Sequence, residues 1–333
     1  MIITRTPFRV SFFGGGTDYP VWYEENGGAV LSTTIDKYCY IFAREFPPFF
    51  PQKLRIVWSK IELADNPDGI EHPSVREVLK HLGLREGIEI HHNGDLPARS
   101  GLGSSSAFTV GLLHALHALK GEMMSKHDLA HEAIHVEQNL IGENVGSQDQ
   151  VAAAFGGFNK ITFASGKRIA VEPIVLPNGQ LDELQDHLVL FFTGLSRNAS
   201  EVAAEQMRNT PKKNAELKRM HEMVDEAIAI LKKGTMAIGD FGRLLHETWQ
   251  LKRSLSSSIS TSAIDEIYDR ARKNGAVGGK LLGAGSGGFM LLFVPPKDQE
   301  RLKTALKGLL YVPFRFENAG TQIIYYGPKT IAR

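Results

Sequence analysis

The chain has 333 residues, of which 42% are hydrophobic and 23% charged, a balance typical of a globular protein with room for two domains of ordinary size. Its formal net charge of +1 gives no global reason to expect a nucleic acid or a membrane surface as partner. A single cysteine, Cys39, excludes an intrachain disulfide, and the sequence has neither an apolar run of membrane-spanning length nor the layout of a signal peptide, so we expect a cytoplasmic enzyme.

The N-terminal part of the chain has the pattern of strands joined by turns. We predict a helix at residues 74–82 and strands at residues 2–13, with an interruption at Pro7, and at 29–43, 54–58 and 88–91. The first strand leads into Gly14-Gly15-Gly16-Thr17-Asp18, where glycines let the backbone approach a ligand and Asp18 can accept hydrogen bonds from substrate hydroxyls. A simple turn in which Asp18 caps the next segment explains the same residues.

The stretch from Pro97 to Ala107 reads Pro-Ala-Arg-Ser-Gly-Leu-Gly-Ser-Ser-Ser-Ala and leads from a strand into a helix. Its glycines let successive N–H groups converge, and its serines lie at the start of the helix, where the positive end of the dipole attracts an anion such as phosphate. A well-capped helix with Ser104 as N-cap is the alternative. Because the chain contains neither a Walker A sequence nor protein-kinase signatures, a phosphate site here belongs to another fold.

A helix predicted at residues 127–141 carries two further patterns. His131-Glu132-Ala133-Ile134-His135 matches a zinc-protease motif and makes a metalloprotease one hypothesis, although the histidines lie on a polar stripe more simply explained as a solvated face. Glu137 lies in the middle of the opposite, apolar face. A buried carboxylate is costly unless it is paired or bound to a metal, so Glu137 is either a site residue or the partner of a core arginine.

The second half of the chain is predicted to be rich in helices. Asp149 lies in the first turn of a short helix at 149–155 and can simply cap it, and a strand follows at 158–163. We take the irregular stretch 171–185 as the domain crossing, followed by a strand at 187–193 and by helices near 212–232, 236–254 and 262–274. Residues 280–288 contain Gly-x-Gly-x-x-Gly, but a predicted strand at 289–294 follows instead of a helix, which excludes a dinucleotide fingerprint.

Taken together, these stretches resemble the GHMP kinases, the family of galactokinase, homoserine kinase, mevalonate kinase and phosphomevalonate kinase. Residues 14–20, 97–107 and 280–288 are similar to its first, second and third motifs. The sequence departs from the family at Arg99, where many relatives have glycine, at Ser106, where alanine is usual, and at Gly15-Gly16, where galactokinases have Glu-His. The resemblance implies an α+β, two-domain GHMP kinase fold, with a ribosomal protein S5 domain 2-like N-terminal domain at 1–175 and a ferredoxin-like, helix-rich C-terminal domain at 176–333.

The resemblance also implies a carbohydrate kinase that uses ATP and Mg²⁺. Asp149 corresponds to the carboxylate that faces the accepting hydroxyl, and Arg9 to the basic residue beside it. Glu137 with Ser104 or Ser105 corresponds to the ligands of Mg²⁺, whose preference is for hard oxygen donors. The ATP site implied by the second and third motifs consists of Pro97, Arg99, Ser100, Gly101, Leu102, Gly103, Ser104, Ser105, Ser106, Gly285 and Gly287.

Residues 12–20, 33–38 and 193–197 are similar to the branch of the family that phosphorylates the anomeric hydroxyl of D-glycero-D-manno-heptose 7-phosphate, for GDP-heptose and surface polysaccharide. This implies sugar contacts from Gly15, Gly16, Thr17 and Asp18 and a cationic subsite drawn from Lys37, Arg197, Lys252 and Arg253. The alternatives are a fucose- or galactose-type kinase without a phosphate subsite and a non-catalytic sensor of sugar and ATP. The sequence leaves the oligomeric state open, with a homodimer as one option.

Overall fold

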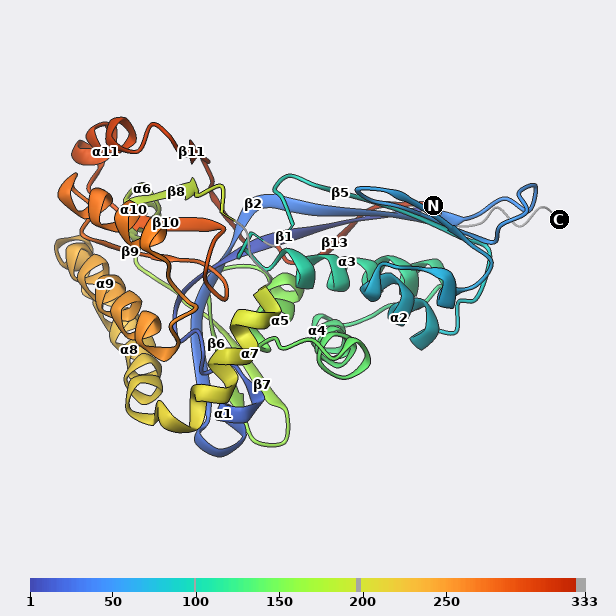
Figure 1. Cartoon of the computed structure of the whole chain (residues 1–333), viewed down its shortest axis with the longest axis horizontal. Helices are drawn as coiled ribbons and strands as arrows, with labels where there is room; N and C mark the ends of the chain where they lie inside the picture. The colour runs from blue at the N-terminus through green and yellow to red at the C-terminus, as the bar shows by residue number, and fades with distance from the viewer. Residues whose placement is uncertain (99, 196–198, 328–333) are drawn as a thin grey trace.

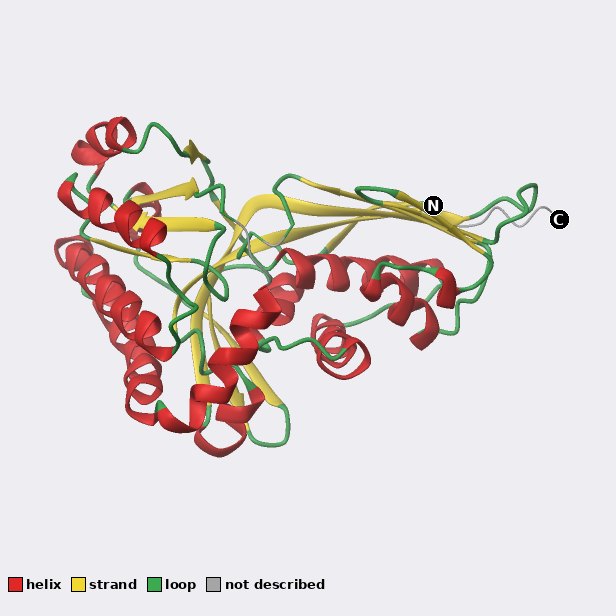
Figure 2. Ribbon diagram, in the orientation of Figure 1, coloured by secondary structure: helices red, strands yellow, loops and turns green. Residues whose placement is uncertain are grey.

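Two β-sheets organise the protein, whose structure is a computed structural model describing residues 1–98, 100–195 and 199–327 (Figures 1 and 2). The larger sheet has nine strands, and the smaller has four in the order β11-β8-β10-β9. The larger sheet contains β1 (Ile2–Phe13), β2 (Gly28–Glu45), β3 (Leu54–Val57), β4 (Ile61–Ala64), β5 (Ile88–Gly94), β6 (Asn159–Ala164), β7 (Arg168–Pro173), β12 (Phe316–Glu317) and β13 (Gln322–Tyr326).

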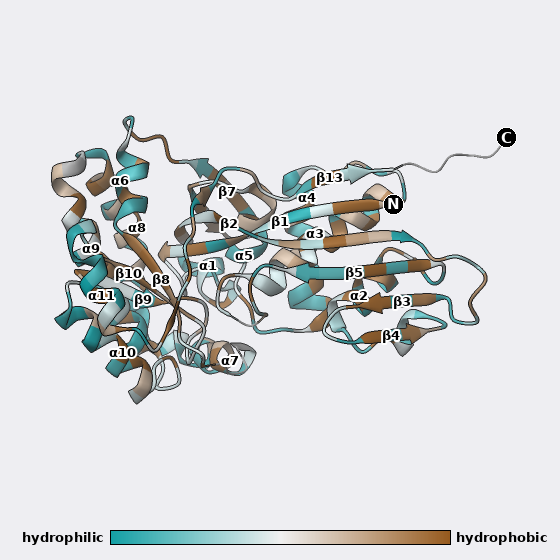
Figure 3. Ribbon diagram, turned by 90° about the horizontal axis from the view of Figure 1, so that it is seen from above, coloured by the Kyte–Doolittle hydropathy of each residue, from teal (hydrophilic) through white to brown (hydrophobic). Residues whose placement is uncertain are grey.

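The larger sheet is built around β1 and the 18-residue β2, which pair antiparallel along most of their length. Its main order is β13-β1-β2-β5-β3-β4, while β6 and β12 also pair with β2, and β7 pairs with β6. β1 runs on past Pro7, where the register with β2 shifts, so the predicted interruption is a local irregularity within one strand. Figure 3 shows hydrophobic residues along strands such as β3 and β4.

Helices cover one face of the larger sheet (Figure 1). They are α1 (Pro20–Asn26), α2 (Pro73–His81), α3 (Ser104–Leu119), α4 (Lys126–His135) and α5 (Gln148–Phe155). α3 packs against β1 and β2 and also contacts α2, α4 and α5, which explains why apolar residues surround it on nearly all sides. This burial holds the start of α3 in a fixed position over β1.

The segment predicted as one helix at 127–141 changes its winding within the structure. α4 ends at His135, and a π-helical segment, Val136–Ile141, continues it. The stretch 171–185 is less irregular than predicted, because β7 extends to Pro173 and α6 (Gln180–Asp186) follows. β7 is a strand because it pairs with β6. Its residues are largely exposed and show no clear strand pattern, so the sequence alone does not predict this pairing.

The smaller sheet and its helices form a second body. Its strands are β8 (Leu188–Phe192), β9 (Gly278–Leu281), β10 (Phe289–Phe293) and β11 (Leu310–Tyr311). Its helices are α7 (Ala199–Asn209), α8 (Asn214–Lys232), α9 (Ile238–Leu255), α10 (Ser262–Lys273) and α11 (Gln299–Ala305). A Cβ at Gly278 would overlap the backbone of Gly242, so the missing side chain lets α9 lie directly on β9.

The last strands of the chain return to the first body. β12 pairs with β2, and β13 pairs antiparallel with β1 (Figure 1). The boundary expected at residue 175 stays a prediction. Strands β12 and β13, within residues 316–326, belong to the larger sheet although they lie in the expected C-terminal domain. In the described part of the chain, no helix combines the length and apolar character needed to span a membrane.

Candidate active site

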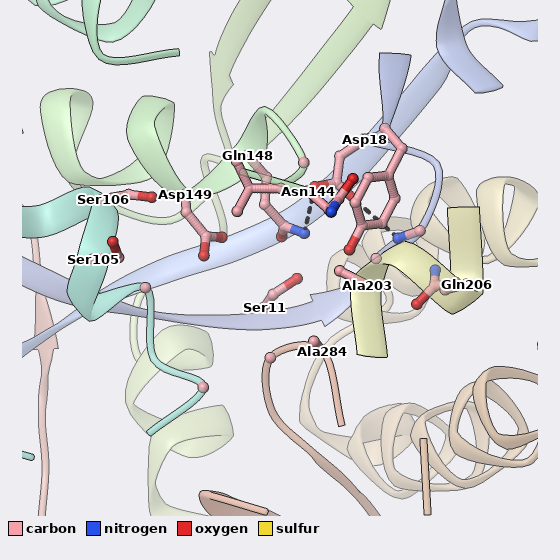
Figure 4. A pocket seen from close by; sticks show the side chains of 18 of the residues that line it. Ser11, Asp18, Ser105, Ser106, Asn144, Gln148, Asp149, Ala203, Gln206 and Ala284 are labelled. Atoms are coloured by element: carbon pink, nitrogen blue, oxygen red, sulfur yellow. Dashed lines mark hydrogen bonds between the residues drawn. The ribbon is translucent and has the colours of Figure 1, made fainter. Parts of the chain in front are cut away.

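A cavity of about 250 Å³ lies where the two bodies meet. The first body contributes β1, the turn after it, the start of α3 and the segment from Glu143 to Asp149. The second body contributes α7, α9, β9 and the turn that begins at Gly283. Figure 4 shows Asp149 toward one end with Ser105 and Ser106, and Asp18, Asn144 and Gln206 toward the other. The predicted site residues that line it are Arg9, Gly15, Gly16, Asp18, Gly101, Gly103, Ser104, Ser105, Ser106, Asp149 and Lys252.

Asp149 and Arg9 form a bidentate pair at this cavity. Arg9 Nε donates to Asp149 Oδ1 and Arg9 Nη2 to Asp149 Oδ2, each at 2.7 Å. The third arm, Nη1, donates to the Gly101 carbonyl at 2.7 Å, so one guanidinium joins the carboxylate to the glycine-serine loop. The Arg9 side chain is 5% exposed and that of Asp149 is 25% exposed, which leaves the carboxylate accessible from the cavity.

The glycine-serine loop leaves the start of α3 open to a ligand. Gly103, at φ +73°, is the N-cap, and α3 has no side-chain cap. Ser104 is the first helical residue and not the cap, so the alternative of a serine-capped helix does not describe this turn. The first-turn N–H groups remain orphan donors at the positive end of a 16-residue helix.

The second and third glycine motifs meet backbone to backbone. Gly101 has φ +82°, and a Cβ there would overlap the Leu282 carbonyl. Gly283 packs in the same way on Gly101, and Gly288 packs on the backbone of Ser100. These contacts explain why both loops are rich in glycine. The backbones of the two loops can touch only if neither places a side chain between them.

Several residues of the implied ATP site support the loop without lining the cavity. The Leu102 carbonyl accepts from Arg9 N at 3.0 Å, and the Ser100 carbonyl accepts from Phe289 N at 3.2 Å. Pro97 is exposed outside the cavity, and Arg99 lies outside the described residues. Gly285 packs against Ile259 instead of facing the cavity, and Gly287 is not among the described lining residues; Gly283 and Ala284 line it in their place.

Asp18 is held at the other end of the cavity. Its Oδ1 accepts from Gly16 N at 2.8 Å and its Oδ2 from Gln148 Nε2 at 2.9 Å. Burial raises the pKa of the Asp18 carboxyl. A Cβ at Gly146 would overlap Asp18, so that glycine lets the neighbouring segment close over the carboxylate. Thr17 is not among the described lining residues: its buried hydroxyl donates to the Gly14 carbonyl at 2.8 Å and braces the turn, and the sugar contact expected there stays a prediction.

Glu137 is fully buried behind the glycine-serine loop. Its Oε2 accepts from Ser106 Oγ at 2.8 Å and also from the Gln150 amide, so its partners are neutral groups and not the core arginine considered above. Burial raises the pKa of Glu137 to about 7. Its Oε1 has no hydrogen-bond partner among the described residues. Thr109, although nearby, donates its hydroxyl proton to the Ser105 carbonyl at 3.2 Å.

This arrangement fits a hard cation. An unpaired carboxylate oxygen with a serine hydroxyl close by is an oxygen donor set suited to Mg²⁺. The serine in contact with Glu137 is Ser106, whereas the expected ligands Ser104 and Ser105 line the cavity. The chain's departure from the family's usual alanine at this position therefore supplies a further oxygen beside Glu137.

The candidate cations for a substrate phosphate separate into two groups. Lys37 pairs with Asp36 at 3.0 Å and Arg253 with Asp265 at 2.8 Å, and neither is among the described residues that line the cavity, so their assignment to the substrate stays a prediction. Arg197 lies outside the described residues. Lys252 does line the cavity, together with Lys280, which sequence reasoning missed although it is the first residue of the third motif at 280–288.

Sequence reasoning also missed the polar residues near Asp18. Ser11, Tyr19, Asn144, Gln148, Ser200 and Gln206 all line the cavity. Among these residues, only Gln148 could have been found from the sequence. It adjoins Asp149, and a polar neighbour of a candidate site carboxylate at the start of a helix is itself a candidate site residue. Ser200 and Gln206 lie on α7, whose approach to the cavity depends on the packing of the two bodies.

The residues of the zinc-protease pattern have other partners. Glu132 forms hydrogen bonds with His117 at 2.8 Å and with His81 at 2.9 Å. His135 pairs with Asn139 at 3.1 Å. Over residues 1–98, 100–195 and 199–327, no three His, Cys, Asp or Glu side chains converge as a metal site. The carboxylate of the motif therefore ties α4 to α2 and α3.

Comparison with known families agrees with this architecture. Residues 72–157 match the GHMP kinases N terminal domain and residues 227–311 the GHMP kinases C terminal domain. The chain belongs to the GHMP kinase family, and the expected two-domain α+β fold is confirmed. It is accordingly a phosphotransferase with an alcohol acceptor and ATP as its phosphoryl donor, and the relatives below make it a sugar kinase.

Two curated relatives are informative. The D-glycero-alpha-D-manno-heptose 7-phosphate kinase of Campylobacter jejuni is 31% identical over 318 residues, covering 92% of this chain and 93% of that protein. The L-fucokinase/L-fucose-1-P guanylyltransferase of Bacteroides fragilis is 27% identical, covering 89% of this chain but 34% of that longer protein.

Solved structures of related kinases have the same fold. A D-glycero-D-manno-heptose 1-phosphate kinase from Bacteroides thetaiotaomicron has a TM-score of 0.76 at 26% identity, covering 98% of this chain and 100% of its own. The galactokinase of Lactococcus lactis, complexed with galactose, has a TM-score of 0.73 at 19% identity, covering 97% and 95%, and supports the fold alone.

Proposed function

We propose that the protein transfers the γ-phosphoryl group of ATP to the anomeric hydroxyl of D-glycero-D-manno-heptose 7-phosphate, forming the 1,7-bisphosphate used for GDP-heptose and surface polysaccharide. The whole-length similarity to the Campylobacter jejuni heptose 7-phosphate kinase supports this substrate. The observation that carries the chemistry is the bidentate Arg9–Asp149 pair between the phosphate loop and Asp18. It lies where a phosphoryl donor and a sugar hydroxyl can meet.

Phosphoryl transfer depends on positioning and charge stabilisation more than on covalent help from the protein. The first-turn N–H groups of α3 and the serine hydroxyls bind the ATP phosphates. Asp149 orients the accepting hydroxyl and takes its proton, while Arg9 fixes both carboxylate oxygens. Glu137 and the loop serines would hold Mg²⁺, which would neutralise charge on the phosphate oxygens.

The sugar is held at the Asp18 end of the cavity. Asp18 keeps acceptor capacity beyond its two bonds to Gly16 and Gln148, because an ionised carboxylate has about four lone-pair positions. Asn144 and Gln206 add amide groups that can donate to or accept from sugar hydroxyls. With the anomeric hydroxyl at Asp149, the rest of the sugar extends toward these side chains.

The test is ADP release by the purified protein with Mg-ATP and a panel of acceptors. Heptose 7-phosphate is compared with mannose, fucose and galactose, and phosphorus NMR of the product identifies the phosphorylated carbon. Strong dependence on the heptose phosphate, with a new anomeric phosphate, supports the proposal. Preference for an unphosphorylated sugar overturns the heptose phosphate assignment. ATP binding without turnover on any acceptor favours the sensor.

A fucose-type kinase is the second candidate. The similarity to the kinase part of the Bacteroides fragilis fucokinase favours it, and so does the absence of Lys37 and Arg253 from the described cavity lining. Fucose carries no phosphate and so needs no cationic subsite. Turnover with fucose that exceeds turnover with the heptose phosphate would select this function.

A further inference from the structure

Two buried lysines line the cavity from the second body. Lys252 on α9 is 5% exposed and Lys280 on β9 is 1% exposed. The Lys252 ammonium donates to the Gly283 carbonyl, and the Lys280 ammonium donates to the Phe12 carbonyl at 3.0 Å. The proposed mechanism uses neither side chain.

Both ammonium groups retain hydrogen-bonding capacity. An ammonium has three donors, and the structure shows one backbone bond for each lysine. None of the ion pairs between described residues includes either lysine. Three carboxylates of the described residues line the cavity: Asp149 is engaged by Arg9, Asp18 by Gly16 and Gln148, and the third is Glu143.

Burial disfavours the charged form of a lysine, and for Lys252 and Lys280 it outweighs the attraction of the nearby Asp18 carboxylate. Burial lowers the pKa of Lys252 to about 8 and lowers that of Lys280 well below its ordinary value. An anion bound in the cavity would reverse this effect, because an opposite charge close by favours the ammonium. The geometry of the two side chains therefore suits an anionic ligand.

The position of the lysines indicates which anion they bind. Gly283, which holds Lys252, packs on Gly101, whose carbonyl accepts from Arg9 at 2.7 Å. Phe12, which holds Lys280, follows Arg9 on the same strand. The two ammonium groups are thus linked to the glycine-serine loop and to the strand that carries Arg9. In a heptose 7-phosphate, the substrate's own phosphate lies at the far end of the carbon chain from the anomeric hydroxyl.

We propose that Lys252 and Lys280 are catalytic residues that form an anion subsite for the phosphoryl group in transfer. The inference rests on the proposed phosphoryl transfer. As the bond from the γ-phosphorus to the β-γ bridging oxygen breaks, ADP leaves with that electron pair. The bond to the sugar oxygen forms, and the hydroxyl proton passes to Asp149. The ammonium groups donate to the non-bridging oxygens of the moving group, where fixed donors stabilise the transition state.

The first experiment measures steady-state kinetics of Lys252→Met and Lys280→Met, which keep the length of the side chain and remove its charge. Lys160→Met, a lysine paired with Asp225 away from the cavity, is the control. We expect kcat to fall by about 10²–10³-fold in each cavity variant, as when an oxyanion donor is removed, with the acceptor KM within about threefold of wild type. Unchanged kcat, or a raised KM confined to phosphorylated acceptors, would overturn the assignment.

The second experiment separates this inference from the identity of the sugar. ADP with Mg²⁺ and aluminium fluoride imitates the planar phosphoryl group, and its binding is followed as a thermal shift beyond that of ADP alone. Wild type and Lys160→Met should show the added shift with aluminium fluoride. Lys252→Met and Lys280→Met should bind ADP normally but should not show the added shift. The same added shift in all proteins would refute the subsite, even if no tested sugar is turned over. Should Lys280→Met not fold, Lys252→Met decides the matter alone.

Discussion

Asp149 presents both carboxylate oxygens to Arg9 and still reaches the cavity. We expect Asp149→Asn to lower kcat by about 10²–10⁴-fold, because an amide cannot accept the proton of the sugar hydroxyl. ATP affinity should stay within about threefold, since the phosphate loop is untouched. Steady-state kinetics and nucleotide titration measure the two effects.

The matched control is Asp225→Asn, which removes another carboxylate that pairs with a cation but does not line the cavity. It should leave both quantities unchanged. An Asp149→Asn protein with wild-type turnover would remove Asp149 from the mechanism.

Glu137 predicts a pH dependence of stability. Burial raises its pKa from 4.5 to about 7, so the folded protein favours the protonated carboxyl. Its contribution to stability is present below pH 4.5 and is lost as the pH rises through about 7. At about 1.4 kcal/mol per pH unit, we expect the metal-free protein to lose up to about 3 kcal/mol of unfolding free energy across this window.

Urea denaturation over a pH series, with and without Mg²⁺, measures this loss. Glu137→Gln should remove this part of the pH dependence of the unfolding free energy. At pH 8, Mg²⁺ should stabilise wild type but not the variant. Identical pH profiles for the two proteins would show that the carboxyl is not held in this way.

Among the elements, the contact between the two glycine loops gives a steric prediction. Gly101→Ala strains a backbone at φ +82° and also drives a Cβ into the Leu282 carbonyl. Gly83→Ala is the control, because Gly83 has φ +68° but nothing within 4 Å of its added Cβ. We expect about 1–2 kcal/mol of destabilisation in the control, and a larger loss together with weakened ATP binding in Gly101→Ala. Denaturation and nucleotide titration compare them, and equal losses would mean that the loops can separate freely.

The segment between the π-helical turn and α5 gives a second prediction at this scale. Gly146→Ala would push this segment away from Asp18, because the new Cβ overlaps the carboxylate. We expect the acceptor KM to rise by about tenfold with ATP affinity unchanged, because the sugar would bind more weakly in both the ground state and the transition state. Gly308→Ala, with open space around its Cβ, is the control. A rise in the KM for ATP alone would place the sugar elsewhere.

At the scale of the whole molecule, the first and last strands are neighbours in one sheet. β13 pairs with β1, and β12 with β2, so the second body is joined to the first through both of its ends. We expect one cooperative unfolding transition in calorimetry instead of two. ADP at about 100 times its Kd should raise the free energy of unfolding by about 2.7 kcal/mol without splitting the transition. Two separable transitions would show that the bodies unfold independently.

The sequence by itself determined features that depend on near neighbours along the chain. The strand at β1, the helix at α10 and the glycine-rich turn before α3 follow from local patterns of apolar residues and glycines. Helical periodicity likewise places Glu137 on a buried face, because a helix face is defined within a few turns.

The tertiary structure alone decided which residues meet. Arg9 and Asp149 are 140 positions apart, and Lys280 and Phe12 are 268 apart. No local pattern encodes such distances, so the sequence could not separate Lys280, which faces the cavity, from Lys37, which pairs with its neighbour Asp36. The physical reason is that propensity and periodicity act over a few residues, whereas a catalytic site forms where packing of the hydrophobic core brings distant segments together.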